Sequence, residues 1–597
     1  MLVTPSRRLV GGLLGAASAL LGTMAAAQER PLAIINAEIF DATGAAPYRG
    51  ALVVQNGRIL AVGPKAKVPK GVSVIDAKGQ ALLPGLFDVH THWTPGGVPS
   101  VTPRIADAYL ASGVTTVNDF HQQPESFEPR RRWLATLAAP HVNFVARIST
   151  PGGHGADWAD EATTRWVDTP EGARTAVDII ATYKPDAIKA FHDGWRYSAA
   201  PDNTSMDAWT LKALTDEAHK HGLKVLTHTV TVERGGAAAT SGVDVIAHSL
   251  QDRLLDPDTV TAIKASGLFY APTLAVYEPV KPGEKPPADP DSPRNQQSRR
   301  KFGYALSNAK TLFDAGVPVA LGTDAGMPGT PHGAASLREL ELLVQAGLTP
   351  SQALIAGTAT SARAMNLLAD RGTLEAGKRA DFILIPGKPW ETIGDVRKVE
   401  RVFIDGKLSA GAGAVRPPAN DRLTMPTLKA KALIDDFEGP VGRTSLDTLR
   451  LDDFDGGRDR SVEVSQVIDR GDGGKVLSVA ARMATKSNAS AGILLPLSRG
   501  SVEPVDATAF KGLKLAVRGD GGPYWVVIRG VAGQWRARIE AGAAWRTVEL
   551  PFSAFEPVAV RGATPTWTGA DLLEVGIDGE RPSRADLWFE LDDVTFY

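Results

Sequence analysis

The sequence predicts an α/β protein built around a parallel β/α barrel, with a small β domain beside the barrel and an all-β domain after it. Two observations predict the barrel. Between residues 84 and 367, short apolar strands alternate with helical stretches, and a glycine often precedes the strand. Metal-binding side chains follow several of these strands, and a barrel that gathers its strand ends at one rim would bring them together.

The chain begins with a predicted signal peptide, residues 1–27. Arg7 and Arg8 precede a weakly apolar stretch, and three alanines offer a cleavage site before Gln28. The paired arginines partly resemble a twin-arginine export signal, so we expect a periplasmic or secreted protein without stable membrane insertion after cleavage. A membrane-anchoring helix is the less favoured alternative, because the apolar run is short for a span.

Two segments flanking the barrel read as one small β domain. Residues 31–83 and 368–410 contain short alternating runs broken by Gly, Pro and Asn-Gly, which predicts a composite β-sandwich interrupted by the barrel of residues 84–367. The alternation of helix and strand in the barrel is clearest at a predicted helix from Met206 to Lys220, which ends at Gly222 and is followed by an apolar strand.

The rest of the chain predicts a separate domain. Residues 411–431 are rich in Pro, Ala and Gly and are expected to form a linker. Residues 432–597 contain many strand-like runs and no helical stretch of comparable strength, which predicts a second β-sandwich. With 597 residues, the protein is long enough for several such cores.

Composition excludes some classes of function. Lys plus Arg is 65 against 67 for Asp plus Glu, so the balance gives no reason to expect nucleic acid as a partner. The sequence has no cysteine, which excludes disulfides, thiolate metal ligands and a lipid-anchoring cysteine.

Six side chains at predicted strand ends form the candidate metal site: His90, His92, Lys189, His228, His248 and Asp324. The first two are two residues apart on one strand, so they point to the same side and can hold one ion. For each single residue a structural role is the alternative: a hydrogen-bonded core histidine, or a helix N-cap in the case of the aspartate.

Lys189 is unusual in this set, because an ammonium group repels a metal ion. Reaction of its amine with carbon dioxide would give a carbamate, whose two oxygens can bridge two ions. The alternative is a buried salt bridge between Lys189 and a carboxylate.

The sequence around these residues resembles the amidohydrolase superfamily, in particular its imidazolonepropionase-, prolidase- and ochratoxinase-like branch. The matching segments are "LPGLFDVHTH", "AIKAF", "LTHT", "IAHS", "GTDAG" and "GTLEAGKRADFILI". The resemblance implies a distorted (β/α)8 TIM barrel with two divalent metal ions. His90, His92 and Asp324 would bind the buried ion, His228 and His248 the exposed ion, and carboxylated Lys189 would bridge them.

The chemistry expected of such a site is hydrolysis. Two ions that share a water lower its pKa, and the hydroxide attacks a carbonyl carbon. Asp324 and His248 are the expected catalytic residues, with the aspartate passing a proton to the leaving nitrogen. Zinc is the first choice of metal because imidazole and carboxylate suit it, and manganese or another divalent ion stays open.

Five further residues are candidates for contact with the substrate: His154, His192, Arg196, Tyr277 and His332. The "GGHG" segment resembles a loop beside the substrate in the same branch, and Arg196 could meet a substrate carboxylate. The "FHDGWRY" segment is bulkier than its prolidase counterpart, which disfavours peptide cleavage. A simple turn is the alternative for the Gly-rich segment of His154, and a packed or solvated loop position is the alternative for Tyr277 and His332.

The C-terminal part resembles the complex I intermediate-associated protein family, a galactose-binding-like β-sandwich, through "LIDDFEG", "WRTVELPFSAFEP" and "FELDDVTFY". Its aromatic residues Tyr524, Trp525, Trp535 and Trp545 could stack on sugars, but core packing is the favoured role. Contact with a glycan or a protein through this domain, and a homo-oligomer, both stay open.

Three functions are compatible with these observations. The favoured one is an exported binuclear hydrolase that cleaves an amide such as an N-acyl amino acid, a dipeptide or a related carboxamide. The second is a hydrolase that opens a cyclic amide or a lactone. The third is a glycan- or protein-binding protein with a catalytically idle barrel, which the six retained donor side chains disfavour.

Overall fold

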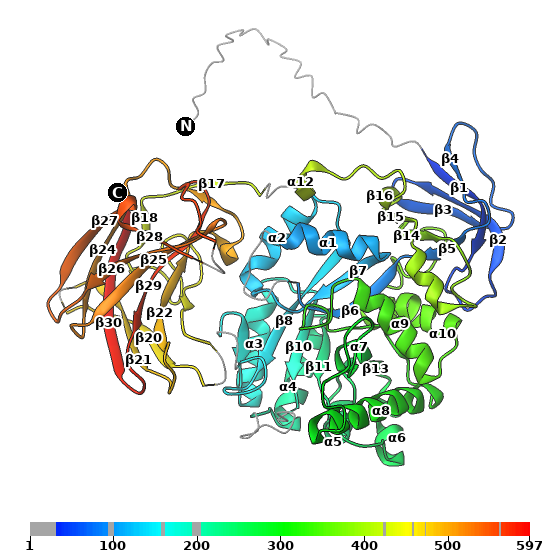
Figure 1. The fold of residues 1–597 in the computed structure, drawn as a ribbon, viewed down its shortest axis with the longest axis horizontal. Coiled ribbons are helices and arrows are strands. Elements are labelled where there is room, and N and C mark those ends of the chain that lie inside the picture. Colours follow the sequence, from blue (N-terminus) through cyan, green and yellow to red (C-terminus); the bar gives the residue numbers. More distant parts are fainter. Residues whose placement is uncertain are drawn as a thin grey trace, which may run out of the picture.

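The structure is a computed structural model. It describes the residue ranges 31–93, 101–156, 161–193, 204–421, 425–456, 459–471, 473–559 and 563–597. The predicted signal peptide and Arg196 lie outside these residues. Figure 1 shows the barrel in the centre, the N-terminal sheet on one side and the C-terminal domain on the other. Within the ranges given, no helix combines the length and the apolar character needed to cross a membrane.

A parallel sheet forms the wall of the barrel. Its strands follow one another in chain order, each hydrogen bonded to the next. They are β6 (Leu86–Thr91), β7 (Val114–Asp119), β8 (His141–Ser149), β10 (Ala187–Phe191), β11 (Lys224–His228), β12 (Val245–Ala247) and β13 (Phe269–Ala271), with β9 (Thr164–Trp166) added beside β8. This arrangement confirms the predicted fold class.

Residues 317–325 close the barrel between β13 and β6 without forming a continuous strand. The Ala320 N–H donates to the Tyr270 carbonyl, and the Val89 N–H donates to the Leu321 carbonyl. Pro318 has no N–H to donate, and Asp324 has a left-handed backbone with φ of 61°. Both features interrupt a regular ladder, so the eighth position of the barrel is distorted.

Helices cover the outside of the barrel (Figure 1). They are α1 (Thr102–Ala111), α2 (Phe127–Leu134), α3 (Pro170–Ala181), α4 (Ala208–Lys220), α5 (Val232–Thr240), α6 (Pro257–Ser266), α7 (Leu274–Tyr277), α8 (Pro293–Asp314), α9 (Ala334–Ala346), α10 (Pro350–Ile355) and α11 (Ser361–Ala364). Side chains fix several of their starts: the carboxylate of Asp207 accepts the N–H of Thr210 at α4, and that of Asp256 accepts the N–H of Thr259 at α6.

The small β domain is assembled from both sides of the barrel. Its strands are β1 (Leu32–Ile39), β2 (Tyr48–Gln55), β3 (Arg58–Gly63), β4 (Ser73–Asp76), β5 (Ala81–Pro84), β14 (Phe382–Ile385), β15 (Arg401–Ile404) and β16 (Lys407–Gly411). The order is β16-β15-β14-β5-β1-β2-β3, with β4 beside β1. Antiparallel pairing of β5 with β14 joins the segment before the barrel to the segment after it.

The C-terminal domain contains two packed sheets. One joins β17 (Leu428–Lys429), β19 (Leu451–Asp452), β22 (Ser490–Pro496), β23 (Val505–Asp506), β25 (Pro523–Gly530), β26 (Gly533–Glu540), β28 (Glu556–Val558) and β29 (Leu572–Glu580). The other joins β18 (Leu433–Asp435), β20 (Val462–Asp469), β21 (Lys475–Arg482), β24 (Gly512–Gly519), β27 (Arg546–Pro551) and β30 (Asp586–Phe596). Apolar side chains from both sheets form one core.

Of the four aromatic residues considered for sugar contact, two are buried and two are partly exposed. Tyr524 and Trp535 are buried in the core of the C-terminal domain. The guanidinium of Arg536 lies 3.9 Å from the ring centre of Trp525, and those of Arg470 and Arg518 lie over Trp545. The favoured role in core packing therefore holds for Tyr524 and Trp535, whereas Trp525 and Trp545 are partly exposed beside arginines.

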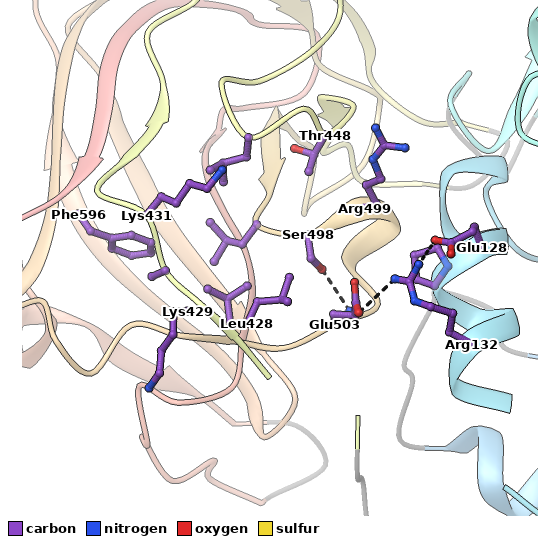
Figure 2. A pocket seen from close by; sticks show the side chains of 15 residues that line it. Glu128, Arg132, Leu428, Lys429, Lys431, Thr448, Ser498, Arg499, Glu503 and Phe596 are labelled. Atoms are coloured by element: carbon purple, nitrogen blue, oxygen red, sulfur yellow. Dashed lines mark hydrogen bonds and ion pairs between the residues drawn. The ribbon is translucent and has the colours of Figure 1, made fainter. Parts of the chain in front are cut away.

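The C-terminal domain contacts the barrel beside α2. Buried Glu125 accepts a hydrogen bond from the Arg443 guanidinium at 2.8 Å and another from the Leu449 N–H at 2.8 Å. Figure 2 shows the groove along this joint, where Arg132 of α2 points to Glu503 of the C-terminal domain at 3.3 Å. Trp133, Met425 and Val502 form a small apolar cluster at the same joint.

Candidate metal centre

The barrel places the six predicted metal ligands at one end of its strands. His90 and His92 lie at the end of β6, Lys189 lies on β10 and His228 ends β11. His248 follows β12, and Asp324 lies in the segment that closes the barrel. All six side chains line one cavity of about 590 Å³. The structure therefore brings together residues that are far apart in the sequence.

Their donor atoms converge. The Asp324 Oδ1 lies 3.0 Å from the His92 Nε2 and 3.4 Å from the His90 Nε2. The Lys189 Nζ lies 3.3 Å from the His90 Nε2 and 3.5 Å from the His248 Nε2. The rings of His228 and His248 are 4.1 Å apart between their centres. One ligand atom from each of His90, His248 and Asp324 falls within 4.8 Å of the others, which is a spacing that a single ion can span.

Supporting residues hold the ligands in place. The buried carboxylate of Asp88 accepts hydrogen bonds from the hydroxyls of Thr323 and Ser336, each at 2.7 Å, and so ties β6 to the segment of Asp324. The Thr273 Oγ1 lies 3.0 Å from the His248 Nδ1, which leaves the Nε2 facing the cavity. Such partners orient the ligands of metal sites.

Burial alters the protonation of the centre. Burial and the charge of Lys189 hold the pKa of His90 well below its usual value, and burial with the nearby His228 does the same for His248. Although burial alone would raise the pKa of Asp324, a hydrogen bond from His92 and electrostatic interactions with the nitrogen atoms around it lower it. Neutral imidazoles and an ionised carboxylate are the forms that bind a metal ion.

Lys189 is buried among these nitrogen atoms. Burial lowers the pKa of its amine to about 7, against the attraction of Asp324 and Asp193. Burial therefore favours the neutral form of the amine, and the His90 and His248 Nε2 atoms lie within 3.5 Å of its Nζ. The donor set of imidazole nitrogens and carboxylate oxygens fits a divalent metal ion.

The cavity also contains residues that the sequence analysis missed. His121 follows β7, and its Nδ1 lies 3.0 Å from the Nδ1 of His92, so it orients that ligand. Arg147 on β8 is almost fully buried and lines the cavity together with Phe120 and Phe191. The signal for His121 was its position just after a strand, whereas Arg147 lies within a strand.

A second cluster of possible ligands lies beside the first. Asp193 Oδ2 is 3.0 Å from His228 Nε2 and 3.7 Å from His154 Nδ1. The ring of His154 stacks on that of His228 at 4.2 Å, and burial together with His228 lowers the pKa of His154 to about 3. His154 thus lines the cavity as a neutral imidazole, and Asp193 is a further residue that the sequence analysis missed.

The other predicted substrate residues occupy different places. His192 is buried, and its Nδ1 contacts the Met206 carbonyl at 3.1 Å rather than the cavity. Tyr277 in α7 lies edge-on to His248 at 6.0 Å between ring centres. The Nε2 of His332 lies 2.9 Å from the carbonyl of His92, behind that ligand, and the ring borders a neighbouring hollow. Arg196 lies outside the described residues.

The barrel and the donor atoms at its rim define a metal-binding barrel protein. Residues 81–409 match the model of the Amidohydrolase family, and residues 478–570 match the model of Complex I intermediate-associated protein 30 (CIA30). The family model covers more than half of the sequence.

Single relatives agree with this match. The imidazolonepropionase of Deinococcus radiodurans is 26% identical over 392 residues, which are 58% of this chain and 87% of the relative. A solved structure from Bifidobacterium longum, assigned as a prolidase, is 27% identical with a TM-score of 0.56 and covers 66% of this chain and 98% of its own. The ochratoxinase of A. niger shares the fold, with 24% identity, a TM-score of 0.55, and 64% and 96% coverage.

The chain therefore belongs to the Amidohydrolase family and carries a CIA30 domain at its C-terminus. Its reaction class is the metal-dependent hydrolysis of carbon–nitrogen bonds. The clusters of histidine and aspartate side chains described above are able to hold the metal.

Proposed function

We propose that this protein is a binuclear metal-dependent hydrolase that cleaves the amide bond of a small carboxylate-bearing substrate, such as an N-acyl amino acid or a dipeptide. The observation that carries the proposal is the convergence of four imidazoles, Lys189 and Asp324 at the end of one cavity. In this proposal His90, His92 and Asp324 hold one ion, and His228 and His248 hold the other.

Lys189 would bridge the two ions as a carbamate. A neutral amine is the form that reacts with carbon dioxide, and the lowered pKa of Lys189 makes this form available near neutral pH. Its Nζ is within 3.5 Å of one histidine from each proposed ion site, His90 and His248, so a carbamate on this atom would reach both sets of ligands. Zinc fits these nitrogen and oxygen donors.

Two such ions would supply an activated water and would polarise the amide carbonyl. The residues of the chain complete the reaction. The ionised Asp324 carboxylate accepts a proton from the attacking water and passes it to the leaving nitrogen. His154 stays neutral and can donate a hydrogen bond to the substrate from the cavity wall. Phe120 and Phe191 add apolar surface to the wall of the same cavity.

The substrate class rests on the charge of the cavity wall. Arg147 is a permanent cation at this wall, and among the described lining residues Asp324, a proposed metal ligand, is the single acid. A substrate carboxylate that reaches this wall would therefore meet a guanidinium. We also propose that the enzyme acts outside the cytoplasm, because residues 1–27 have the sequence of an export signal.

The test combines metal analysis with a substrate screen. We expect purified protein to contain about two zinc-type ions per chain and to hydrolyse members of a panel of N-acyl amino acids, dipeptides and lactams. A chelator should abolish this hydrolysis. Protein without bound metal, and without hydrolysis after zinc is added, would leave only a binding function for the barrel.

Asp324→Asn tests the proton transfer. The variant keeps an oxygen atom at the site but loses the base, so we expect most of the metal to remain while kcat falls by about 10²- to 10⁴-fold. Metal content by elemental analysis and steady-state kinetics give the two readouts. A kcat close to that of the wild type would remove Asp324 from the mechanism.

A further inference from the structure

The loop that carries His154 is held from two directions. From within the barrel, the Ser149 hydroxyl at the end of β8 donates to the carbonyl of His154 at 2.6 Å. Gly155 has a φ of 85°, and a Cβ at this position would lie 2.6 Å from the ring of Phe191. The backbone therefore passes tightly against the cavity wall, and a small displacement of this loop would move the His154 imidazole.

The second contact comes from the C-terminal domain. The Arg460 Nη1 donates to the carbonyl of Ala156, two residues after His154, at 2.7 Å. The same guanidinium lies 5.2 Å from the ring centre of Trp166. Trp166 belongs to β9, which pairs with β8 at Ser149. Arg460 thus contacts the loop after His154 and the strand that follows this loop.

Arg460 is itself well supported within its own domain. Its guanidinium lies 4.6 Å from the ring centre of Phe454. The neighbouring Ser461 donates from its N–H and its hydroxyl to the two oxygens of the Asp455 carboxylate, at 2.7 and 2.9 Å. Lys486 donates to the carbonyls of Asp455 and Gly456. The C-terminal domain therefore presents the guanidinium on a braced loop.

From these contacts we propose that the C-terminal domain contributes to the active site through Arg460. This residue is a positioning residue that holds His154 at the cavity wall. The contacts described for Arg460 reach the Ala156 carbonyl and the Trp166 ring, whereas the six proposed metal ligands line the cavity. The geometry therefore predicts an effect on substrate binding and turnover that leaves the metal in place. This inference rests on the proposed function only for its kinetic readout.

The first measurement needs no substrate. We expect Arg460→Met in the full-length, zinc-loaded protein to exchange the backbone amides of residues 149–156 about tenfold faster or more, because a hydrogen bond from a charged donor is lost. Hydrogen-exchange mass spectrometry measures this effect. Arg460→Lys should restore part of the protection, since an ammonium can still donate to the Ala156 carbonyl.

Arg132→Met is the matched control. Arg132 also bridges the two domains, through Glu503, but it belongs to α2 and not to the loop of His154 (Figure 2). We expect this variant to leave exchange at residues 149–156 unchanged. If Arg460→Met leaves amide exchange at residues 149–156 unchanged, the contact is dispensable and the proposal is overturned. If Arg460→Met speeds amide exchange equally at residues 124–134 of the domain joint, the contact serves only domain docking, which also overturns the proposal.

The second measurement is kinetic. With a substrate found in the screen, Arg460→Met should lower kcat/KM about tenfold or more at unchanged metal content, and Arg132→Met should not. If no substrate is hydrolysed by the wild type, the proposed function fails, whereas the exchange experiment still decides on Arg460. Faster exchange without any change in kcat/KM would confine Arg460 to a structural role and would overturn its role in positioning.

Discussion

Single residues at the centre hold unusual backbone conformations. His248 and Asp324 have φ values of 82° and 61°, in a region that non-glycine residues rarely adopt. Such conformations cost about 1–3 kcal/mol each and persist where the surroundings fix them. Here the His248 N–H donates to the Ala271 carbonyl, and the Asp324 N–H donates to the His90 carbonyl. The fold thus offsets local strain at a proposed metal ligand, His248, and at the proposed proton-transfer residue, Asp324.

Lys189 gives the first prediction at this scale. Lys189→Ala removes the atom on which the carbamate would form, so we expect the variant to lose most of its bound metal and its activity. Added short carboxylic acids should restore part of both, because their oxygens can replace the bridge. Elemental analysis with and without added acetate checks this. Lys212→Ala, which removes an exposed lysine paired with Asp216, is the control and should keep its metal. A fully metallated, active Lys189→Ala protein would contradict the bridge.

Arg147 gives the second prediction. Arg147→Met should raise KM for an N-acyl amino acid by about tenfold to a hundredfold, because a charged hydrogen bond is worth about 1.5–3 kcal/mol. The corresponding methyl ester or amide should show little change. Arg147→Lys should recover only part of the affinity, since lysine lacks the planar fork of arginine. An equal loss for charged and neutral substrates would show that Arg147 only shapes the cavity.

Residue positions were predictable from the sequence where a strand end marks the site. His90, His92, His228 and His248 all follow this pattern, and the structure places them in one cavity. His192 was predicted to contact the substrate but points away from the cavity. Side chains alternate along β10, so Lys189 and Phe191 face the cavity and Asp193 lies on the same side, whereas His192 lies on the other. Arg147 was missed because it lies inside β8, where a charged residue was not expected.

At the scale of elements, α7 depends on a buried acid from α9. The Glu339 carboxylate accepts the N–H groups of Leu274 and Ala275 at 2.9 and 2.7 Å. These are the first residues of α7, directly after Thr273, which orients His248. Despite the two N–H donors, burial raises the pKa of Glu339 to about 8. The folded protein therefore retains this proton to a higher pH than the unfolded chain does.

This shift predicts a pH dependence of stability. The unfolded chain loses the proton near pH 4.5 and the folded state near pH 8, so ionisation of Glu339 reduces the free energy of unfolding as the pH rises between these values. We expect Glu339→Gln to remove roughly 2–4 kcal/mol of this pH-dependent loss between pH 5 and 8. Urea unfolding at several pH values measures it. Glu341→Gln is the control, because Glu341 lies on the same helix but is paired with arginines. If the free energy of unfolding changes equally with pH in the wild type and in Glu339→Gln, Glu339 is not the group responsible.

The order of elements was largely readable from the sequence, because helical and strand periods differ and glycines mark the turns. The segment that ends at Asp324 was predicted to be a strand of the barrel. It forms only isolated bridges, since Pro318 lacks a donor and the left-handed Asp324 turns the backbone. The periodicity of apolar residues does not predict the left-handed backbone that places Asp324 in the site.

At the scale of the whole molecule, buried Glu125 joins the barrel to the C-terminal domain. We expect Glu125→Ala to weaken docking by about 1–3 kcal/mol, because the Arg443 guanidinium and the Leu449 N–H lose their acceptor. Calorimetry should then resolve the unfolding of the two domains further apart. Glu128→Ala, which removes an exposed partner of Arg132, should change stability by about 0.5 kcal/mol or less. Similar effects of the two substitutions would contradict the role of Glu125.

The presence of separate domains was predicted from composition, but their contact was not. Glu125 and Arg443 are 318 positions apart, and nothing in the local pattern of either residue marks the other as its partner. The same is true of Arg460 and Ala156. Complementarity between distant surfaces becomes visible only when the chain is folded.

The pairing of β5 with β14 has a consequence for biosynthesis. Leu82 and Pro84 find their partners Leu384 and Phe382 only after the ribosome has made the entire barrel. Until then the nascent polypeptide exposes an open sheet edge that can recruit other chains. A chain that ends anywhere inside the barrel should therefore be prone to self-association. A chain that lacks only the CIA30 domain still contains β14, which pairs with β5 and covers this edge.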